Sequence, residues 1–253
     1  QFNALTTDQV PLLTTAQVSS LSTAQFAGMT TDDVQALSTD HAKVLSSAQL
    51  RALGTEQVAA LGTDDLALLT TAAVRGLTSD QIAALTTDQI VALATGQVAS
   101  LTTQQLVGLR TDQIANLASD DLRALGTASI RSLNTEQFNA LTTDQVPLLS
   151  TAQVAALATA QLAGMTTDDV LALSTDHAKV LSSAQLRAFG TEQIAALGTD
   201  DLAQLSTNAV RGLTSEQVSA FTTDQIVALS TAQVNSLTTQ QLVGLRTDQI
   251  ANL

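Results

Sequence analysis

The chain divides into eight-residue repeats from Thr6 to Leu253 without an insertion or a deletion. These 248 residues make 31 octads, and typical octads read TTAQVSSL (14–21) and TTDQIVAL (86–93). A unit this short cannot bury its own apolar side chains, so repeats of a fixed short period indicate an array in which each unit packs on its neighbours. The sequence therefore predicts a solenoid.

Three of the eight octad positions are nearly constant. Position 2 is Thr or Ser in all 31 octads, and position 8 is Leu in 27 of them. Position 5 is Val, Ile, Leu or Phe in every octad except the two that carry Ala42 and Ala178. Position 3 is usually Asp or Ala, and position 4 is usually Gln or Asp. Positions 5 and 8 are therefore the expected core.

A longer repeat lies on top of the octads. Residues 1–117 align with residues 137–253 at an offset of 136 residues, and 99 of these 117 positions are identical. We expect one continuous octad array over 1–253, with an internal duplication of 1–136 and 137–253. The chain begins within an octad, and neither end shows the polar capping unit that solenoid ends usually carry. We therefore expect a fragment of a longer protein, or ends that other chains cover.

One short α-helix per octad agrees best with this pattern. A continuous helix, like disorder, remains a minor alternative. It fits poorly because the apolar pair at positions 5 and 8 would rotate by about 80° per octad and leave any single face. The Thr or Ser at position 2 predicts a helix N-cap. The Asp or Glu that follows lies in the first turn, where the positive end of the helix dipole stabilises a negative charge. Glycines at position 1 predict left-handed C-caps; they are Gly54, Gly62, Gly126, Gly190 and Gly198. Each octad then holds about six helical residues and a two-residue corner.

A β-solenoid remains the alternative fold. Thr, Val and Ile favour strands. However, the apolar spacings of three and five residues do not match the two-residue alternation of a strand. Pro11 and Pro147 at position 6 conflict mildly with a helix because each removes an N–H that would bond back along it. We expect these two octads to be distorted.

The charge balance excludes several kinds of partner. The chain has 10 Lys and Arg against 23 Asp and Glu, a net charge of −13, and it has no Cys. The acidity argues against nucleic acid and anionic membranes, and no apolar run is long enough to insert into a membrane. The basic residues look scattered along the chain and form no stripe; they are Lys43, Arg51, Arg75, Arg110, Arg123, Arg131, Lys179, Arg187, Arg211 and Arg246.

Two sets of residues are candidate chemical sites. His41 and His177 follow Asp40 and Asp176, but a general base needs convergent partners, and the sequence offers none nearby. We interpret each His as a replacement for the usual Gln on a polar face. Five acidic pairs could attract calcium but lack a calcium-loop pattern; they are Asp32–Asp33, Asp64–Asp65, Asp120–Asp121, Asp168–Asp169 and Asp200–Asp201. We expect no catalytic, cofactor-binding or metal-ligating residue, and only weak screening of the acidic face by divalent cations.

Runs such as LTTDQIVALATGQVASLTTQQL (85–106) resemble the octapeptide-repeat tracts of very large bacterial secreted and cell-surface proteins. The resemblance covers the whole chain. It implies an extracellular structural element and carries no catalytic residue across.

We therefore expect an all-α solenoid of very short helices that is not an enzyme. The predicted function is structural: an adhesin stalk on the bacterial cell surface, or a secreted filament that self-associates into a homopolymer. Uncovered solenoid ends would favour stacking head to tail. The alternative is a solenoid binding module that presents an extended surface to a protein or glycan ligand.

Overall fold

The computed structural model describes residues 6–253, and these residues form only helices and the short segments that connect them. The chain falls into two compact units, residues 1–133 and residues 134–253. Each α-helix has four to six residues and occupies one octad. The prediction of an all-α solenoid with one short helix per octad is confirmed, and the β-solenoid is wrong.

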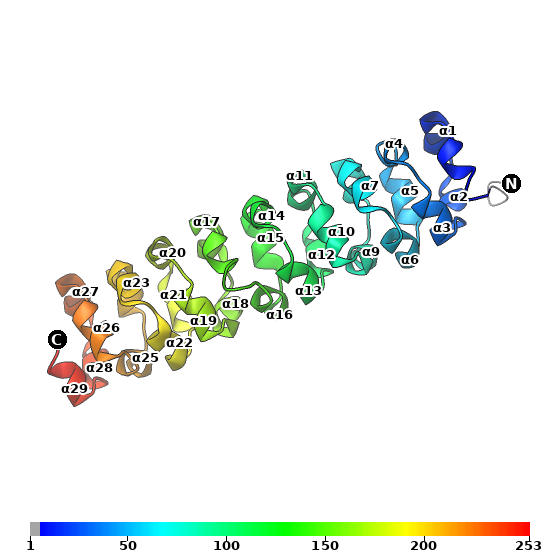
Figure 1. Cartoon of the computed structure of the whole chain (residues 1–253). Coiled ribbons are helices and arrows are strands. Elements are labelled where there is room, and N and C mark those ends of the chain that lie inside the picture. The colour runs from blue at the N-terminus through cyan, green and yellow to red at the C-terminus, as the bar shows by residue number, and fades with distance from the viewer. Residues whose placement is uncertain (1–5) are drawn as a thin grey trace. The chain divides into compact units, whose positions relative to one another are not determined.

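In the first unit a 3-10 helix precedes fifteen α-helices (Figure 1). They are η2 (Val10–Leu12), α1 (Thr15–Ser20), α2 (Thr23–Ala27), α3 (Thr31–Gln35), α4 (Thr39–Ala42), α5 (Ser47–Ala52), α6 (Thr55–Ala59), α7 (Thr63–Leu68), α8 (Thr71–Val74), α9 (Ser79–Ala84), α10 (Thr87–Ala92), α11 (Thr95–Ala99), α12 (Thr103–Val107), α13 (Thr111–Ala115), α14 (Ser119–Ala124) and α15 (Thr127–Ser132).

The second unit repeats this arrangement, with its 3-10 helix after the first α-helix. Its elements are α16 (Thr135–Asn139), η3 (Val146–Leu148), α17 (Thr151–Ala156), α18 (Thr159–Gly164), α19 (Thr167–Leu171), α20 (Thr175–Val180), α21 (Ser183–Arg187), α22 (Thr191–Ala196), α23 (Thr199–Gln204), α24 (Thr207–Arg211), α25 (Ser215–Ser219), α26 (Thr223–Ala228), α27 (Thr231–Ser236), α28 (Thr239–Val243) and α29 (Thr247–Ile250).

The N-cap of each α-helix is the residue at position 1, so the expected cap at position 2 is wrong by one residue. In α10, Thr86 has extended backbone angles, and its hydroxyl accepts a hydrogen bond from the Gln89 N–H at 3.2 Å. The Gln89 side chain reaches back and accepts from the Thr86 N–H at 2.8 Å. The pair forms a capping box, while Thr87 is the first helical residue.

The glycines at position 1 are not left-handed C-caps. Gly54, Gly62 and Gly198 are N-caps with negative φ, and no described residue has a positive φ. The corner between helices consists instead of an extended residue at position 8 followed by an extended residue at position 1, as at Leu93 and Ala94. The expected two-residue corner is therefore present without a left-handed residue.

The two proline octads differ from the rest, as expected. Pro11 and Pro147 lie in 3-10 helices that span Val10–Leu12 and Val146–Leu148. A 3-10 helix bonds each residue three positions back, and a proline that lacks an N–H near its start removes no such bond. Proline therefore replaces the α-helix with a shorter turn but leaves the octad period intact.

The core consists of positions 5 and 8, as predicted. Ile82 and Leu85 in the first unit and Val218 and Phe221 in the second are fully buried. The two positions lie three residues apart on one helix face. Position 4 is also buried in most octads, although its residue is polar, and Gln89 and Gln225 are examples. Most helices therefore bury two apolar side chains and one polar side chain, which is usually the amide of Gln.

Within each unit, the main helix–helix contacts join helices three octads apart. Helix α4 packs on α1 and on α7, and α20 packs on α17 and on α23 (Figure 1). Hydrogen bonds between turns reach slightly further, because side chains at position 4 bond to carbonyls 28 and 31 residues earlier. A turn of the solenoid in either unit therefore takes between three and four octads.

The glutamine at position 4 joins one turn to the next. Gln89 Nε2 donates to the Leu61 carbonyl at 2.7 Å and to the Val58 carbonyl at 3.3 Å. Gln225 makes the same bonds to Leu197 at 2.7 Å and to Ile194 at 2.9 Å. These carbonyls lie at the C-terminal end of an octad, where helix acceptors are only partly satisfied. The Val58 and Ile194 carbonyls also accept from the N–H groups of Leu61 and Leu197. One amide thus satisfies an N–H at one helix end and two carbonyls at another.

Position 7 lies close to position 2 of the previous turn. A Cβ added to Gly108 would come within 2.8 Å of the Ser79 Cβ, and one added to Gly244 within 2.9 Å of the Ser215 Cβ. Gly76 faces Ser47 in the same way. The residues of each pair are 29 apart. In these three pairs a serine at position 2 accompanies the glycine where two turns approach closely, whereas Gly164 faces Thr135.

Candidate functional site

The two histidines replace the turn-joining glutamine inside the solenoid. His177 Nδ1 accepts a hydrogen bond from the Ser174 N–H at 3.3 Å, and its Nε2 lies 2.7 Å from the Leu149 carbonyl oxygen. Because the backbone N–H can only donate, the ring proton must sit on Nε2 and be donated to the carbonyl. His41 makes the same bonds to Ser38 and Leu13. Both rings are buried, so the expectation of a polar face is wrong, but the replacement of Gln is correct.

Aspartates at position 4 occupy the same buried place. Asp65, Asp121 and Asp201 are 2–7% exposed, and burial raises the pKa of each carboxyl group. The neighbouring carboxylates Asp64 and Asp200 raise the pKa of Asp65 and Asp201 further, while a hydrogen bond from Thr95 partly offsets the effect at Asp121. An ionised carboxylate can accept from the helix N-terminus, but it cannot donate to carbonyls of the previous turn.

The acidic pairs do not converge into a metal site. In each of the pairs Asp64–Asp65 and Asp200–Asp201, the first side chain is exposed and the second is buried. Over residues 6–253, His, Cys, Asp and Glu nowhere gather in a group of three that could hold an ion. Among the same residues, no helix has the length and apolarity needed to cross a membrane.

Half of the basic residues form ion pairs with a nearby position-3 acid. Lys43 Nζ lies 2.8 Å from Asp40 Oδ1, and Lys179 and Arg123 bond to Asp176 and Asp120 in the same way. Arg110 and Arg246, at position 1, bond to Asp112 and Asp248 and also donate to carbonyls of the previous turn. These bonds lower the pKa of Asp40, Asp112, Asp176 and Asp248.

The other five arginines have no such partner. They all lie at position 6, in octads whose position 3 is Ala or Asn. Among the described residues, no carboxylate oxygen lies within 4.0 Å of their guanidinium groups. These residues are Arg51, Arg75, Arg131, Arg187 and Arg211.

Four of these five arginines come together in pairs. Arg51 and Arg75 are 24 residues apart, which places them on adjacent turns, and both line two hollows of about 230 and 340 Å³. The smaller hollow is also lined by Ser79 and Gln104, and the larger one by Ser47 and Gly76. We call the two hollows together the first arginine groove. The expectation that the basic residues are scattered is therefore wrong for this pair.

The second unit contains the same feature. Arg187 and Arg211 line a hollow of about 390 Å³ together with Ser215 and Gln240. Arg187 also lines a hollow of about 290 Å³ beside Gly212, and its Nε donates to the Gly212 carbonyl at 3.1 Å. We call these two hollows the second arginine groove. A pair of guanidinium groups is suited to binding an oxyanion through several charge-assisted hydrogen bonds.

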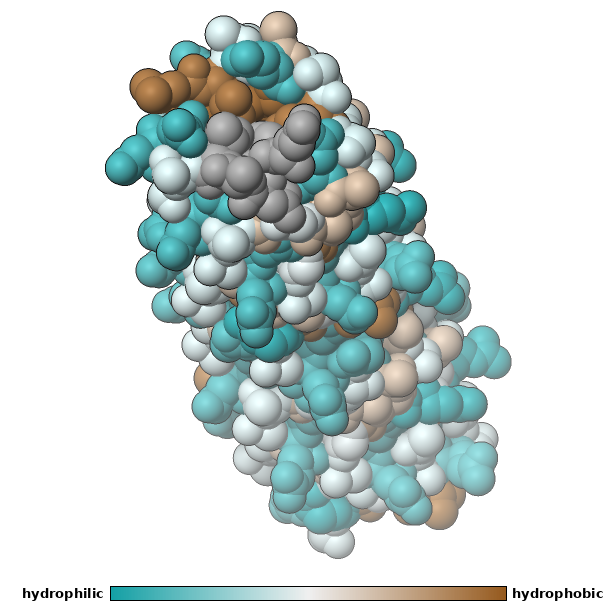
Figure 2. Space-filling model, turned by 90° about the vertical axis from the view of Figure 1, so that its right-hand side faces the viewer, coloured by the Kyte–Doolittle hydropathy of each residue, from teal (hydrophilic) through white to brown (hydrophobic). Residues whose placement is uncertain are grey.

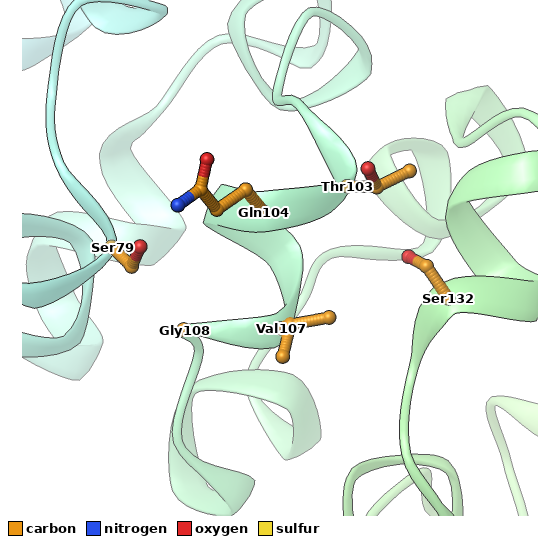
Figure 3. A pocket seen from close by; sticks show the side chains of 6 residues that line it. All are labelled: Ser79, Thr103, Gln104, Val107, Gly108 and Ser132. Atoms are coloured by element: carbon orange, nitrogen blue, oxygen red, sulfur yellow. The ribbon is translucent and has the colours of Figure 1, made fainter.

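A further hollow of about 510 Å³ adjoins the first arginine groove and shares Ser79 and Gln104 with it. In Figure 3, Thr103 and Val107 of α12 point toward Ser132 of α15. No charged residue lines this hollow, so it offers a surface for contact but no charged group to bind an ion. Hydrophilic and neutral colours dominate the face drawn in Figure 2, and the hydrophobic residues form separate brown patches.

Sequence reasoning missed two features of this surface and interior. It assigned Gln at position 4 to a polar face, although its high frequency among otherwise variable polar positions was a signal of a structural role. It treated the arginines as scattered because the number of octads per turn could not be read from the sequence. With a contact spacing of 24 residues, the pairs Arg51–Arg75 and Arg187–Arg211 are evident.

A known family model matches this chain. The model of the ALTTAQ repeat matches seven segments that together cover most of the chain: residues 11–39, 43–67, 58–95, 114–151, 179–205, 194–231 and 227–253. No curated protein matches the sequence.

Proposed function

Because the chain belongs to the ALTTAQ repeat family, we propose that it is a structural scaffold whose octads extend an array and catalyse no reaction. The observation that carries this proposal is the turn-joining glutamine. The same bond recurs within each unit, from Gln49 to Gln113 in the first and from Gln185 to Gln249 in the second. Together with the core pair, it attaches neighbouring turns of a unit to each other. In such an array, stability comes from repeated contacts between neighbouring units, so added octads add turns of the same kind.

We place this scaffold outside a bacterial cell, as an adhesin stalk or as the subunit of a self-associating filament. The resemblance of its LTTDQI-type runs to repeat tracts of secreted and cell-surface proteins supports this location. The buried, hydrogen-bonded His41 and His177 support a role without catalysis, since both ring nitrogens are already engaged by backbone groups.

Cryo-electron microscopy of the native material, with and without a chelator of divalent cations, tests the proposal. Uniform filaments with a regular repeat would support the filament, and isolated thin rods of constant length would support the stalk. Protease treatment of intact cells tests the location, because a surface protein is cut while the cells remain closed. Compact single particles, or full protection from the protease in intact cells, would contradict the proposal.

The arginine grooves favour a second candidate, a binding module. Arg51 and Arg75 lack acidic partners in a protein of net charge −13, although equivalent basic residues have them. A scaffold alone does not require such an arrangement.

A further inference from the structure

We propose that each arginine groove binds an oxyanion, the carboxylate, sulfate or phosphate group of a ligand, between its two guanidinium groups. The first site uses Arg51 and Arg75, and the second uses Arg187 and Arg211. This proposal does not depend on where the protein is located or on whether it forms filaments.

The geometry brings the two positive charges of each site to one surface. Arg51 and Arg75 both line the hollow of about 230 Å³ and the adjoining one of about 340 Å³. Two guanidinium groups on adjacent turns repel each other unless an anion lies between them. The planar N–H groups of arginine match the oxygen spacing of carboxylate, sulfate and phosphate, which gives paired hydrogen bonds.

The surroundings leave these charges available. In most octads an acid occupies position 3, but three of the octads at the first groove hold Ala48, Ala72 and Gln104 there. The fourth holds Asp80, which does not line either hollow. The hydroxyl and amide groups of Ser79 and Gln104 face the same hollow and can donate further hydrogen bonds. The hollow therefore offers donors on several sides and no lining carboxylate that would compete.

The second groove keeps this chemistry although the two copies differ in sequence around it. Gln240 corresponds to Gln104, and the residues that line the second groove are uncharged apart from the arginines. Ser215 takes the place of Ser79 beside Arg211. One chain thus carries two sites of the same design.

The chain also supplies internal controls. Arg131 lies at position 6 and has no acidic partner, but the residue 24 positions before it is Val107. Arg131 therefore matches the groove arginines in its octad position and in having no acidic partner, but it has no second arginine on the previous turn. Arg123 also lies at position 6, but it pairs with Asp120 at 3.5 Å. Among residues 6–253, only the grooves combine two guanidinium groups that have no carboxylate partner.

Nuclear magnetic resonance of the arginine Nε–H groups in the full chain tests the proposal. Sodium sulfate, phosphate or acetate is added at constant ionic strength, with chloride as the compensating ion. We expect saturable shifts for Arg51, Arg75, Arg187 and Arg211, with a dissociation constant on the order of 1 mM, and only small linear shifts for Arg131 and Arg123.

The pairing is tested with Arg75→Gln, and Arg123→Gln is the matched control. Losing one guanidinium should weaken the response of Arg51 by about tenfold or more, because charge-assisted hydrogen bonds are lost. The second groove in the same molecule should be unchanged, and unaltered circular dichroism would show that the variant is folded. Equal shifts at Arg131 and Arg51, or an Arg51 response that survives Arg75→Gln, would overturn the proposal.

Dilution of the protein without added anion distinguishes two sources of the oxyanion. If Arg51 and Arg75 shift on dilution and sedimentation shows a concentration-dependent dimer, the bound group is a carboxylate of a second copy. If they shift only with added sulfate, phosphate or acetate, the bound group is a free anion or part of another ligand. If neither condition moves them, the grooves bind no oxyanion and the proposal fails.

Discussion

The octads Thr86–Leu93 and Gly62–Leu69 occupy equivalent places in the first unit, but they differ at position 4. In the first, Gln89 accepts from Thr86 and donates to Leu61 on the previous turn. In the second, Asp65 occupies this buried place with a pKa that burial raises. The comparison shows that the side chain at position 4 has two partners. It must accept a hydrogen bond from the N–H at the start of its own helix and donate one to a carbonyl of the previous turn. Glutamine supplies both groups, whereas ionised aspartate supplies only the acceptor.

Replacing the glutamine should have the largest effect. Gln89→Leu keeps the volume but leaves the Thr86 N–H and the Leu61 carbonyl without this partner inside the protein. Unsatisfied buried groups cost about 1–3 kcal/mol each, so we expect a loss of about 3 kcal/mol in the free energy of unfolding. Urea unfolding followed by far-ultraviolet circular dichroism measures it, since the chain has no Trp or Tyr.

Gln17→Leu is the matched control for this change. Gln17 is exposed and forms the capping box with Thr14, but it lies in an octad that has no earlier turn among the described residues. It should lose only the capping contribution of about 1 kcal/mol. Equal losses in Gln89→Leu and Gln17→Leu would show that the bond between turns contributes nothing.

Replacing the buried aspartates with a residue that can donate a hydrogen bond should raise the free energy of unfolding instead of lowering it. Asp→Asn at positions 65, 121 and 201 adds an amide of the same shape, which can donate to the previous turn. We expect a gain of about 1 kcal/mol per site at pH 7, the size of a typical hydrogen bond. Thermal unfolding of the triple variant measures the gain, and the exposed Asp64→Asn should have almost no effect.

The same variant tests the pH dependence. The folded pKa values of Asp65, Asp121 and Asp201 are raised above the unfolded value of about 3.9. The stability that their protonated forms contribute is therefore fully present below the unfolded pKa and is lost as the pH rises through the folded pKa. The gain of the triple variant over wild type should be largest at pH 7 and should shrink toward pH 4. A gain that is constant with pH would contradict the assignment.

Removing the hydroxyl group at position 1 or at position 2 shows which of the two caps the helix, and the expected loss of stability is smaller than for the changes above. Thr86→Ala should cost about 1 kcal/mol because Thr86 is the N-cap of α10, whereas Thr87→Ala should stay within about 0.5 kcal/mol. Ala94 and Ala158 already serve as N-caps without a side-chain hydrogen bond. Urea unfolding of the two variants compares them directly. A larger loss of stability for Thr87→Ala than for Thr86→Ala would show that the residue at position 2 is the N-cap.

The sequence predicted the helices, the two-residue corners and the core, because the spacing of positions 5 and 8 is a local property of an octad. The cap was misplaced by one residue because hydroxyl residues occupy both positions 1 and 2 in octads such as Thr86–Leu93. The role of Gln89 and the pairing of Arg51 with Arg75 depend on which octads lie on adjacent turns. That relation is set by the rotation between successive short helices, which a uniform repeat does not reveal.

The smallest effect should come from exchanging histidine and glutamine. His177 accepts from Ser174 and donates to Leu149, which are the two bonds that glutamine makes elsewhere. His177→Gln should therefore change the free energy of unfolding by less than about 0.5 kcal/mol, while His177→Leu should lose about 3 kcal/mol by the reasoning applied to Gln89. Urea unfolding at pH 8, where free histidine is neutral, compares the two variants. If both substitutions were equally harmful, the imidazole would have a role that glutamine cannot fill; if both were harmless, the bonds between turns would contribute little at this octad.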